Sequence, residues 1–190
     1  MLQVYTGNGK GKTTAAIGLA IRSLGAQKKI YFCQFMKTLD YSEQKILEQF
    51  APQLVLKTSG KPYFIAKEGM LTDEEIAKWG DMLKVYPEGN PPQDYVDIVN
   101  KSLDEALIAM KSKQYDLIIL DEINVAMFYD LVTRNTLEKF LDAVPSNVEI
   151  VCTGRYAPDW LCSRADLVTE MKEIKHYYQK GIEGRRGIEN

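Results

Sequence analysis

The residues of this chain best suited to chemistry form one glycine- and lysine-rich stretch near its start, Tyr5-Thr-Gly-Asn-Gly-Lys-Gly-Lys-Thr-Thr14. The stretch lies between an apolar segment, Leu2 to Tyr5, and a helix-like segment, Ala15 to Leu24, which is the context that a phosphate-binding P-loop requires. Glycines allow backbone angles that turn successive N–H groups toward an anion, and the following helix adds the positive end of its dipole. We therefore predict a nucleotide triphosphate site here.

The residues of this loop have separate predicted tasks. Lys12 supplies a mobile cation for phosphate oxygens, and Thr13 offers a hydroxyl group to a bound Mg²⁺. The usual P-loop pattern has a glycine where this chain has Thr6, and an ordinary solvent-exposed turn is the alternative interpretation. The spacing and the flanking segments favour the nucleotide site, and its expected residues are Thr6, Gly7, Asn8, Gly9, Lys10, Gly11, Lys12, Thr13 and Thr14.

A second chemical signal is the pair Asp121-Glu122, which follows the apolar run Leu117 to Leu120. P-loop proteins place such carboxylates at the end of a buried strand, where they orient Mg²⁺ across from the P-loop hydroxyl. Acids end many buried strands, so the pair gains its meaning from the P-loop on the same chain. We predict that Thr13, Asp121 and Glu122 serve a Mg²⁺ or Mn²⁺ ion.

Three further cations occupy positions where a phosphate group could reach them. Lys37 and Arg155 follow predicted strands, and ligands of open α/β sheets bind beyond the carboxyl ends of strands. Arg22 lies near the end of the first predicted helix. Each has a simpler alternative role, as a loop lysine, a subunit contact or a helix-dipole partner. His176 is the only histidine, which excludes a histidine-based metal centre or catalytic triad within one chain.

The elements that must hold these residues alternate between strand-like and helix-like patterns. Predicted strands cover residues 2–5, 29–35, 54–57, 115–122, 149–153 and 167–171. Predicted helices cover residues 13–24, 42–50, 72–84, 95–111, 125–129, 136–143 and 158–163. This alternation predicts an α/β fold with a mainly parallel sheet and helices on both faces. Together with the P-loop it indicates a P-loop NTPase (RecA-like) architecture, and we expect a single domain over residues 1–190.

Two segments lack a regular pattern. Residues 58–71 contain Gly60, Pro62 and the aromatic cluster Tyr63-Phe64-Ile65, which forms either a small satellite core or a face for a flat ligand. Residues 86–94 contain Pro87, Pro91 and Pro92 and are predicted to form an irregular break between helices.

The composition limits the classes of function. The net charge of −2 argues against a broad nucleic-acid-binding surface, which usually carries a basic excess. The 3 cysteines are widely spaced, which argues against a zinc site and for reduced thiols. No apolar run is long enough to span a bilayer, so we expect a cytoplasmic protein with no membrane partner.

Several motifs of this chain, taken together, resemble one family. They are Tyr5 to Ala16, Gln34 to Lys37, Leu120 to Ala126, Thr153 to Pro158, Ala165 to Met171, Ile174 to His176 and Arg185 to Glu189. In this order they are similar to the ATP:corrinoid adenosyltransferases, and more narrowly to the P-loop type that acts on cob(I)yrinic acid a,c-diamide or cob(I)alamin. The resemblance covers nearly the whole chain and includes Thr6, because the loop of that family reads Thr-Gly-(Asn/Asp)-Gly-Lys-Gly-Lys-Thr.

The resemblance implies a reaction and its site. ATP would donate its 5′-deoxyadenosyl group to Co(I) of a corrinoid and release triphosphate, in adenosylcobalamin biosynthesis or salvage. Lys12, Thr13 and Glu122 would be the catalytic residues, with Thr13 and Glu122 as Mg²⁺ ligands and Arg22 as a nucleotide contact. ATP would lie reversed relative to ordinary P-loop enzymes, so that C5′ faces the corrin. Because Co(I) is the nucleophile, the protein would only orient the substrates and stabilise charge.

The resemblance also implies partners and a corrin face. The best-known members use a Gly-Phe-Thr-Trp stretch to strip the lower cobalt ligand, so that a flavodoxin-like donor can reduce Co(II). This chain has Lys61-Pro-Tyr-Phe-Ile-Ala-Lys67 in the corresponding region, and we expect Phe64 or Tyr63 to take over that task. Residues 79–99 form a longer segment than is usual in the family and could be a lid or a subunit contact. A homodimer is also implied.

Two other functions fit the residues alone. An ordinary P-loop ATPase or small-molecule kinase would use a residue such as Glu122 to position a base or a water molecule, and it would form ADP. An ATP-gated corrinoid-binding module would bind the corrinoid without turnover. The product that ATP yields in the presence of reduced corrinoid distinguishes the three functions.

Overall fold

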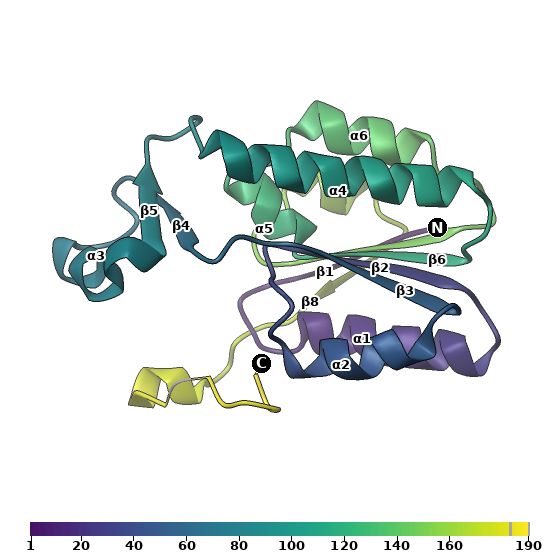
Figure 1. The fold of residues 1–190 in the computed structure, drawn as a ribbon, viewed down its shortest axis with the longest axis horizontal. Coiled ribbons are helices and arrows are strands. Elements are labelled where there is room, and N and C mark those ends of the chain that lie inside the picture. The colour runs from purple at the N-terminus through teal and green to yellow at the C-terminus, as the bar shows by residue number, and fades with distance from the viewer. Residues whose placement is uncertain (183, 190) are drawn as a thin grey trace.

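The computed structural model describes residues 1–182 and 184–189, and its centre is a six-stranded sheet (Figure 1). The strand order is β3-β2-β6-β7-β1-β8, and all neighbouring strands run parallel. The carboxyl ends of parallel strands meet at one edge of the sheet, so residues that follow these strands are brought together. The strands are β1 (Leu2–Thr6), β2 (Ile30–Phe35), β3 (Leu54–Ser59), β6 (Leu117–Asp121), β7 (Glu149–Thr153) and β8 (Leu167–Glu170).

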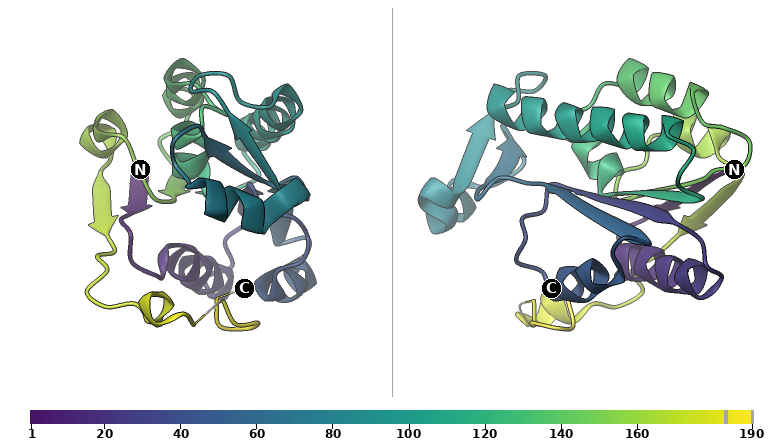
Figure 2. Two further views of the ribbon diagram at one scale, coloured as in Figure 1. Left: turned by 90° about the vertical axis from the view of Figure 1, so that its left-hand side faces the viewer. Right: turned by 45° about the vertical axis from the view of Figure 1, so that its right-hand side comes forward.

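Helices cover both faces of this sheet (Figures 1 and 2). One face carries α1 (Lys12–Gly25) and α2 (Ser42–Leu47), which a 3₁₀ turn, η1 (Glu48–Phe50), extends. The other face carries α4 (Gln93–Lys111), α5 (Ile123–Phe128) and α6 (Arg134–Asp142), and α7 (Asp159–Arg164) contacts β1. The predicted fold class, a P-loop α/β architecture with a parallel sheet between helices, is confirmed.

The central strands are buried along their whole length because helices pack on both sides of them. Every residue of β2 and of β6 is buried. Phe32 and Ile119 belong to the core beneath α1 and α2, whereas Phe35 and Ile118 belong to the core beneath α4 and α5. Alternation of two apolar faces on one strand explains why these segments read as continuous hydrophobic runs in the sequence.

A small second sheet projects beyond the carboxyl edge of the main sheet (Figure 1). It pairs β4 (Phe64–Lys67) with β5 (Leu83–Tyr86) in parallel, and α3 (Asp73–Trp79) connects the two strands. We call this unit, residues 60–92, the projection. Neither strand was predicted, and the predicted helix over residues 72–84 is wrong in its second half.

The helix ends early for a local reason. Thr72 and Glu75 form a capping box at its start. At its end, Gly80 has a φ of +50°, which ends the regular turn, and a 3₁₀ turn, η2 (Gly80–Met82), leads into β5. Leu83–Tyr86 then gains backbone partners from β4, so strand pairing outweighs the helical tendency of the sequence.

The aromatic cluster at residues 63–65 divides between core and exposed side chains, and its role as a face for a flat ligand stays a prediction. Ile65 is buried in the main core, and Tyr63 packs against that core. Phe64 points outward with 54% of its surface exposed, and its ring meets Trp79 edge-on with centroids 4.8 Å apart. Only the Tyr63 and Ile65 part of the cluster is core.

After β8 the chain forms a short 3₁₀ turn, η3 (Tyr177–Lys180). Figure 2 shows this turn on the same side of the sheet as α1 and α2. We call residues 171–182 and 184–189 the tail. Within the part of the chain that the structure describes, no helix has the length and apolar character needed to cross a membrane.

Candidate functional site

The loop between β1 and α1 has the backbone form expected of a P-loop. Gly7 has a φ of +93° and Gly11, which caps α1, a φ of +121°, values that side-chain-bearing residues rarely adopt. Thr6 is the last residue of β1, and its hydroxyl accepts a hydrogen bond of 3.2 Å from the Ala157 N–H. The position that is usually glycine therefore ties the P-loop strand to the chain that follows β7.

Two of the glycines also serve a purpose that the sequence did not disclose. The Gly9 N–H donates to the Met171 carbonyl oxygen at 2.6 Å, and the Met171 N–H donates to the Thr6 carbonyl at 2.8 Å. A Cβ atom on Gly7 would lie 2.5 Å from the Met171 oxygen, and one on Gly9 would lie 2.7 Å from it. The tail therefore lies directly against the P-loop, and side chains at positions 7 and 9 would push it away.

Lys12 is buried, with its ammonium folded back onto the loop. Its Nζ donates to the carbonyl oxygens of Gly7 at 2.7 Å and Gly9 at 2.8 Å. Burial lowers the pKa of Lys12, and attraction to Glu122 opposes that shift. An incoming phosphate offers this cation a charged partner in place of two neutral carbonyls, which favours phosphate binding.

Asp121 is the fully buried centre of a polar network. Its Oδ1 accepts hydrogen bonds from the hydroxyls of Thr13 at 3.0 Å and Thr153 at 2.6 Å. Its Oδ2 accepts from Gln34 at 3.2 Å and from the Lys37 ammonium at 3.0 Å. The ends of three strands, β2, β6 and β7, and the first turn of α1 are thereby tied together. The sequence predicted Thr13, Asp121 and Lys37 here but missed Thr153, whose only sequence signal is its place at the end of a buried strand.

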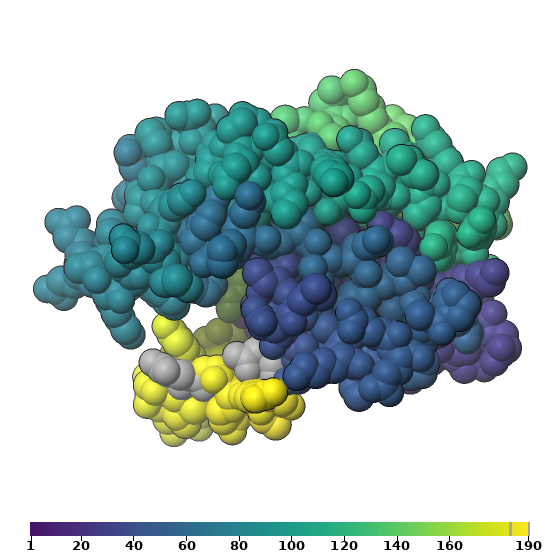
Figure 3. Space-filling view, viewed as in Figure 1, coloured from purple at the N-terminus to yellow at the C-terminus, as the bar shows by residue number. Residues whose placement is uncertain are grey.

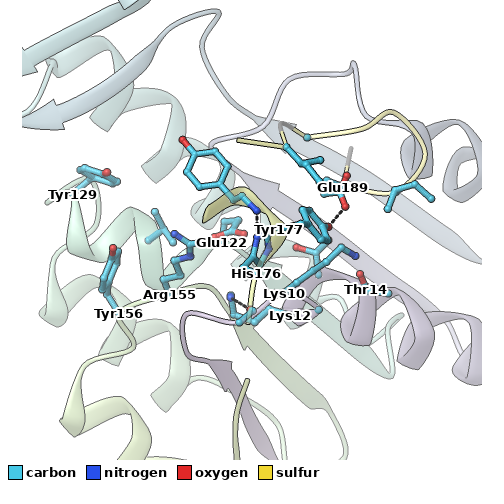
Figure 4. Close-up of a pocket in the computed structure, with 18 residues that line it drawn as sticks. Lys10, Lys12, Thr14, Glu122, Tyr129, Arg155, Tyr156, His176, Tyr177 and Glu189 are labelled. Atoms are coloured by element: carbon cyan, nitrogen blue, oxygen red, sulfur yellow. Dashed lines mark hydrogen bonds between the residues drawn. The ribbon is translucent and has the colours of Figure 1, made fainter. Parts of the chain in front are cut away.

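Glu122 points into the open part of the site rather than into this network (Figure 4). Its φ of +65° is left-handed, which turns the chain sharply from β6 into α5. Burial and the neighbouring Asp121 raise the pKa of Glu122 to about 7, against the opposing pull of Lys37, Lys12 and Arg155. A cation bound between the two carboxylates would reverse that shift, so the pair is suited to a metal ion.

The raised pKa predicts that the protein without nucleotide or metal loses stability as the pH rises. The folded state binds a proton on Glu122 up to about pH 7, whereas an unfolded glutamate releases it near 4.5. Its contribution is therefore complete below pH 4.5 and lost as the pH rises through 7, a change on the order of 2–3 kcal/mol. Denaturant unfolding at pH 5 and pH 8 should show this loss in wild type and not in Glu122→Gln. An equal loss in both proteins would contradict the assignment.

A pocket of about 520 Å³ opens between the P-loop, the carboxyl edge and the tail (Figure 4). Arg155 and Tyr156 reach it from the chain after β7, and Tyr129 reaches it from the end of α5. The tail forms the remaining wall, where Tyr177 donates to Glu189 and the Arg185 guanidinium lies over the Tyr177 ring. Lining residues that the sequence did not predict include Val125, Tyr129, Tyr156, His176, Tyr177, Tyr178 and Ile188.

A second pocket of about 330 Å³ lies between the carboxyl edge and the projection, and it is lined mainly by apolar and aromatic side chains. Phe64 and Met82 form its outer wall, Tyr63 and Tyr95 its inner wall, and Tyr129 lines both this pocket and the first one. Figure 3 shows a notch between the projection, which contributes residues to the second pocket, and the tail, which contributes residues to the first.

The structure brings most predicted residues together and leaves two apart. Lys10 and Thr14 line the first pocket with Lys12 and Thr13, while Asn8 is exposed in the same loop. Arg22 lies exposed in the last turn of α1, and it lines none of the pockets described here. Phe64 lines the second pocket and not the first. The proposed role of Arg22 stays a prediction.

The donor set of the site suits a hard divalent cation. Thr13, Asp121 and Glu122 offer only oxygen atoms, which are the ligands that Mg²⁺ prefers. Among the residues that the structure describes, no group of three or more His, Cys, Asp or Glu side chains could hold a metal ion. Mg²⁺ in nucleotide sites usually combines one or two carboxylates with phosphate oxygens and water, and the residues present fit that pattern.

The whole chain is similar to one protein family. The family model for the ATP:corrinoid adenosyltransferase BtuR/CobO/CobP matches residues 1–190. A corrinoid adenosyltransferase from Sinorhizobium is 28% identical over 192 residues, covering 100% of this chain and 79% of the relative. The corrinoid adenosyltransferase CobA of Salmonella typhimurium is 28% identical over 187 residues, covering 98% and 83%. Among solved structures, flagellar accessory protein FlaH from Methanocaldococcus jannaschii has a TM-score of 0.47 at 12% identity, covering 89% of this chain and 69% of FlaH, too distant to bear on function.

The full-length family match agrees with the site. A P-loop, a carboxylate pair at the end of β6 and an adjoining aromatic pocket lie on one edge of the sheet. The Sinorhizobium and Salmonella relatives are both named corrinoid adenosyltransferases, and their similarity extends over nearly the whole length of this chain. This chain therefore belongs to the ATP:corrinoid adenosyltransferase family and is a transferase that acts on corrinoids.

Proposed function

We propose that this protein transfers the 5′-deoxyadenosyl group of ATP to Co(I) of cob(I)alamin or cob(I)yrinic acid a,c-diamide, with release of triphosphate. This reaction would serve adenosylcobalamin biosynthesis or salvage. The observation that carries the proposal is that the two pockets adjoin: Tyr129 lines both the phosphate-loop pocket and the aromatic pocket beneath the projection. Ligands bound in the two pockets would therefore be neighbours, with Tyr129 beside both.

The bond changes in this reaction are few. The electron pair of Co(I) attacks C5′ of ATP, a cobalt–carbon bond forms, and the C5′–O bond breaks with its electrons going to the triphosphate. Cobalt is formally oxidised to Co(III) and no proton transfer is required. The protein therefore needs no nucleophile of its own, and its contribution is orientation and stabilisation of the leaving charge.

The loop residues would bind the triphosphate. N–H groups of residues 7–14 and the Lys12 ammonium meet its oxygens, and Arg155, exposed at the pocket wall, adds a second cation. Lys12 must leave the carbonyls of Gly7 and Gly9 to do so, which it can do by rotation of its side chain. Thr13, Asp121 and Glu122 would hold Mg²⁺, whose chemistry here is to neutralise the charge that grows on the leaving group. ATP would lie with its ribose toward the notch and C5′ facing the corrin.

The aromatic pocket would receive one edge of the corrin. Apolar side chains there would favour loss of the lower cobalt ligand, which makes Co(II) easier to reduce. We further propose a flavodoxin-like reductant, a homodimer, a single domain over residues 1–190 and a cytoplasmic location, with no nucleic acid or membrane partner. These properties come from the sequence and the family resemblance.

The products of ATP test the proposed reaction. Protein, ATP, Mg²⁺ and chemically reduced corrinoid should give the adenosyl–cobalt spectrum and triphosphate in equal amounts. ADP or phosphate as the sole nucleotide product, at a rate indifferent to corrinoid, would assign the chain to ATPase or kinase chemistry instead. Tight corrinoid binding with ATP left intact would assign it to the binding-module alternative.

The exposed Phe64 provides a test of the corrin face. If its ring excludes the lower ligand, Phe64→Ala should lower the rate about tenfold when Co(II) must be reduced on the enzyme, because loss of one aromatic contact is worth roughly 1 kcal/mol or more. With corrinoid supplied as Co(I), the rate should stay near wild type. Phe50→Ala, which removes an exposed ring from η1, is the matched control. An equal loss with both cobalt states would give Phe64 a structural role only.

A further inference from the structure

Lys37 is held in place by the ends of two neighbouring strands. It follows β2 through Met36, whose φ of +58° is the left-handed conformation and turns the chain sharply. The Met36 N–H donates to the Ser59 carbonyl oxygen at the end of β3, at 2.9 Å. A Cβ atom on Gly60 would lie 2.4–2.7 Å from the Lys37 backbone, so only glycine at position 60 admits this path. The backbone of Lys37 is therefore fixed independently of its side chain.

The side chain of Lys37 ends in a group of oxygen atoms. Its Nζ lies 3.0 Å from Asp121 Oδ2, 3.4 Å from Thr13 Oγ1 and 3.8 Å from Glu43 Oε1. The Lys37 side chain is 11% exposed and that of Asp121 is 0% exposed. The Lys37–Asp121 ion pair is therefore largely shielded from solvent.

Two of these oxygen-bearing groups, Thr13 and Asp121, are among those proposed above to hold Mg²⁺. Mg²⁺ needs its oxygens at about 2.0–2.1 Å in a near-octahedral arrangement. The Lys37 ammonium already lies 3.0 Å from Asp121 Oδ2 and 3.4 Å from the Thr13 hydroxyl. A divalent ion at these oxygens would lie within a few ångströms of a buried positive charge and be repelled by it.

On the basis of the proposed Mg²⁺ site, we propose that Lys37 is an internal counter-ion that excludes the metal from the site until nucleotide binds. The phosphates of ATP supply enough negative charge for both cations and give the ammonium another partner. Lys37 is then a positioning residue that makes tight metal binding depend on bound nucleotide. In the absence of nucleotide, Lys37 would keep its ion pair with Asp121, and it would release that carboxylate only when the phosphates of ATP are bound.

The test is a titration of the nucleotide-free protein with Mn²⁺. The electron paramagnetic resonance signal of free Mn²⁺ measures how much of the ion stays unbound. Wild type should bind Mn²⁺ weakly, and Lys37→Met should bind it about tenfold more tightly or better, a usual size for coupling between two ligands. With a β,γ-methylene analogue of ATP present, the Mn²⁺ affinity of wild type should rise strongly. The Mn²⁺ affinities of wild type and Lys37→Met should then differ by less than about threefold.

Two variants separate this effect from a general change in charge. Lys37→Arg keeps the positive charge, so this variant should still bind Mn²⁺ weakly. Lys45→Met removes an exposed lysine from the neighbouring α2 and should leave the Mn²⁺ affinity unchanged. Lys37→Gln, monitored by circular dichroism, repeats the measurement with a polar replacement. An unchanged affinity in Lys37→Met, an equal gain in Lys45→Met, or tight Mn²⁺ binding by wild type alone would overturn the proposal. The adenosylation assay on wild type is separate from these titrations, so failure of the proposed reaction would be recognised independently.

Discussion

Lys12→Ala is expected to lower the rate of adenosyl transfer about a thousandfold, equivalent to roughly 4 kcal/mol of transition-state stabilisation. The reason is the position of the ammonium: it is buried at the centre of the P-loop, and in the free protein it donates to two neutral carbonyl oxygens. It is therefore available to the leaving triphosphate, on which a full charge grows as the C5′–O bond breaks. Single-turnover formation of the adenosyl–cobalt spectrum measures the effect.

Corrinoid binding should survive this substitution, because Lys12 lines the phosphate-loop pocket and not the aromatic one. Lys28→Ala is the matched control, since it removes an exposed lysine that precedes β2 at the opposite edge of the sheet. A Lys12→Ala protein that adenosylates at more than a tenth of the wild-type rate would show that charge stabilisation by this lysine is not essential. Loss of corrinoid affinity in parallel would indicate a structural defect instead.

Gly7→Ala is expected to destabilise the protein by about 3 kcal/mol and to abolish nucleotide binding. Two effects add at this position. A φ of +93° is strained for alanine, and its Cβ would lie 2.5 Å from the Met171 carbonyl oxygen. Either the P-loop or the tail must move, and both form walls of the phosphate pocket. The melting temperature should fall by roughly 6–12 °C in a chain of this size.

Gly18→Ala is the control that isolates the P-loop effect. Gly18 lies on the exposed side of α1, and a Cβ atom there would meet nothing within 4 Å. Alanine should therefore stabilise the helix by about 0.5–1 kcal/mol and leave ATP binding intact. If Gly7→Ala instead melts within 2–3 °C of wild type, roughly 1 kcal/mol, and binds ATP, the close contact between the P-loop and the tail is not needed.

Much of the fold and of the phosphate site could be predicted from the sequence because its signals are local. Lys12 and Thr13 follow a glycine-rich turn at fixed spacing, and Asp121 follows a continuous apolar run. Such runs identify buried parallel strands, and parallel strands bring their carboxyl ends to one edge. The predicted positions of Lys37 and Arg155 at that edge follow from the same rule, and both are found there.

The parts that could not be predicted depend on contacts between distant segments. β4 and β5 are four residues each, and they are strands only because they pair with one another. The tail became a wall of the pocket because Met171 bonds to the P-loop, and no spacing in the sequence signals that contact. Likewise, no local sequence feature shows whether Arg22 lies near the phosphates. Helix geometry places it in the last turn of α1, away from the P-loop at the start of that helix.

The most direct test of the central claim is a crystal structure of the protein with Mg²⁺, ATP and a Co(II) corrinoid. We expect the triphosphate on residues 7–14, with C5′ of the ribose directed into the notch between the tail and Phe64 and facing cobalt. The opposite orientation, with the γ-phosphate in the notch and the ribose against the protein away from any space that admits a corrin, would contradict the account.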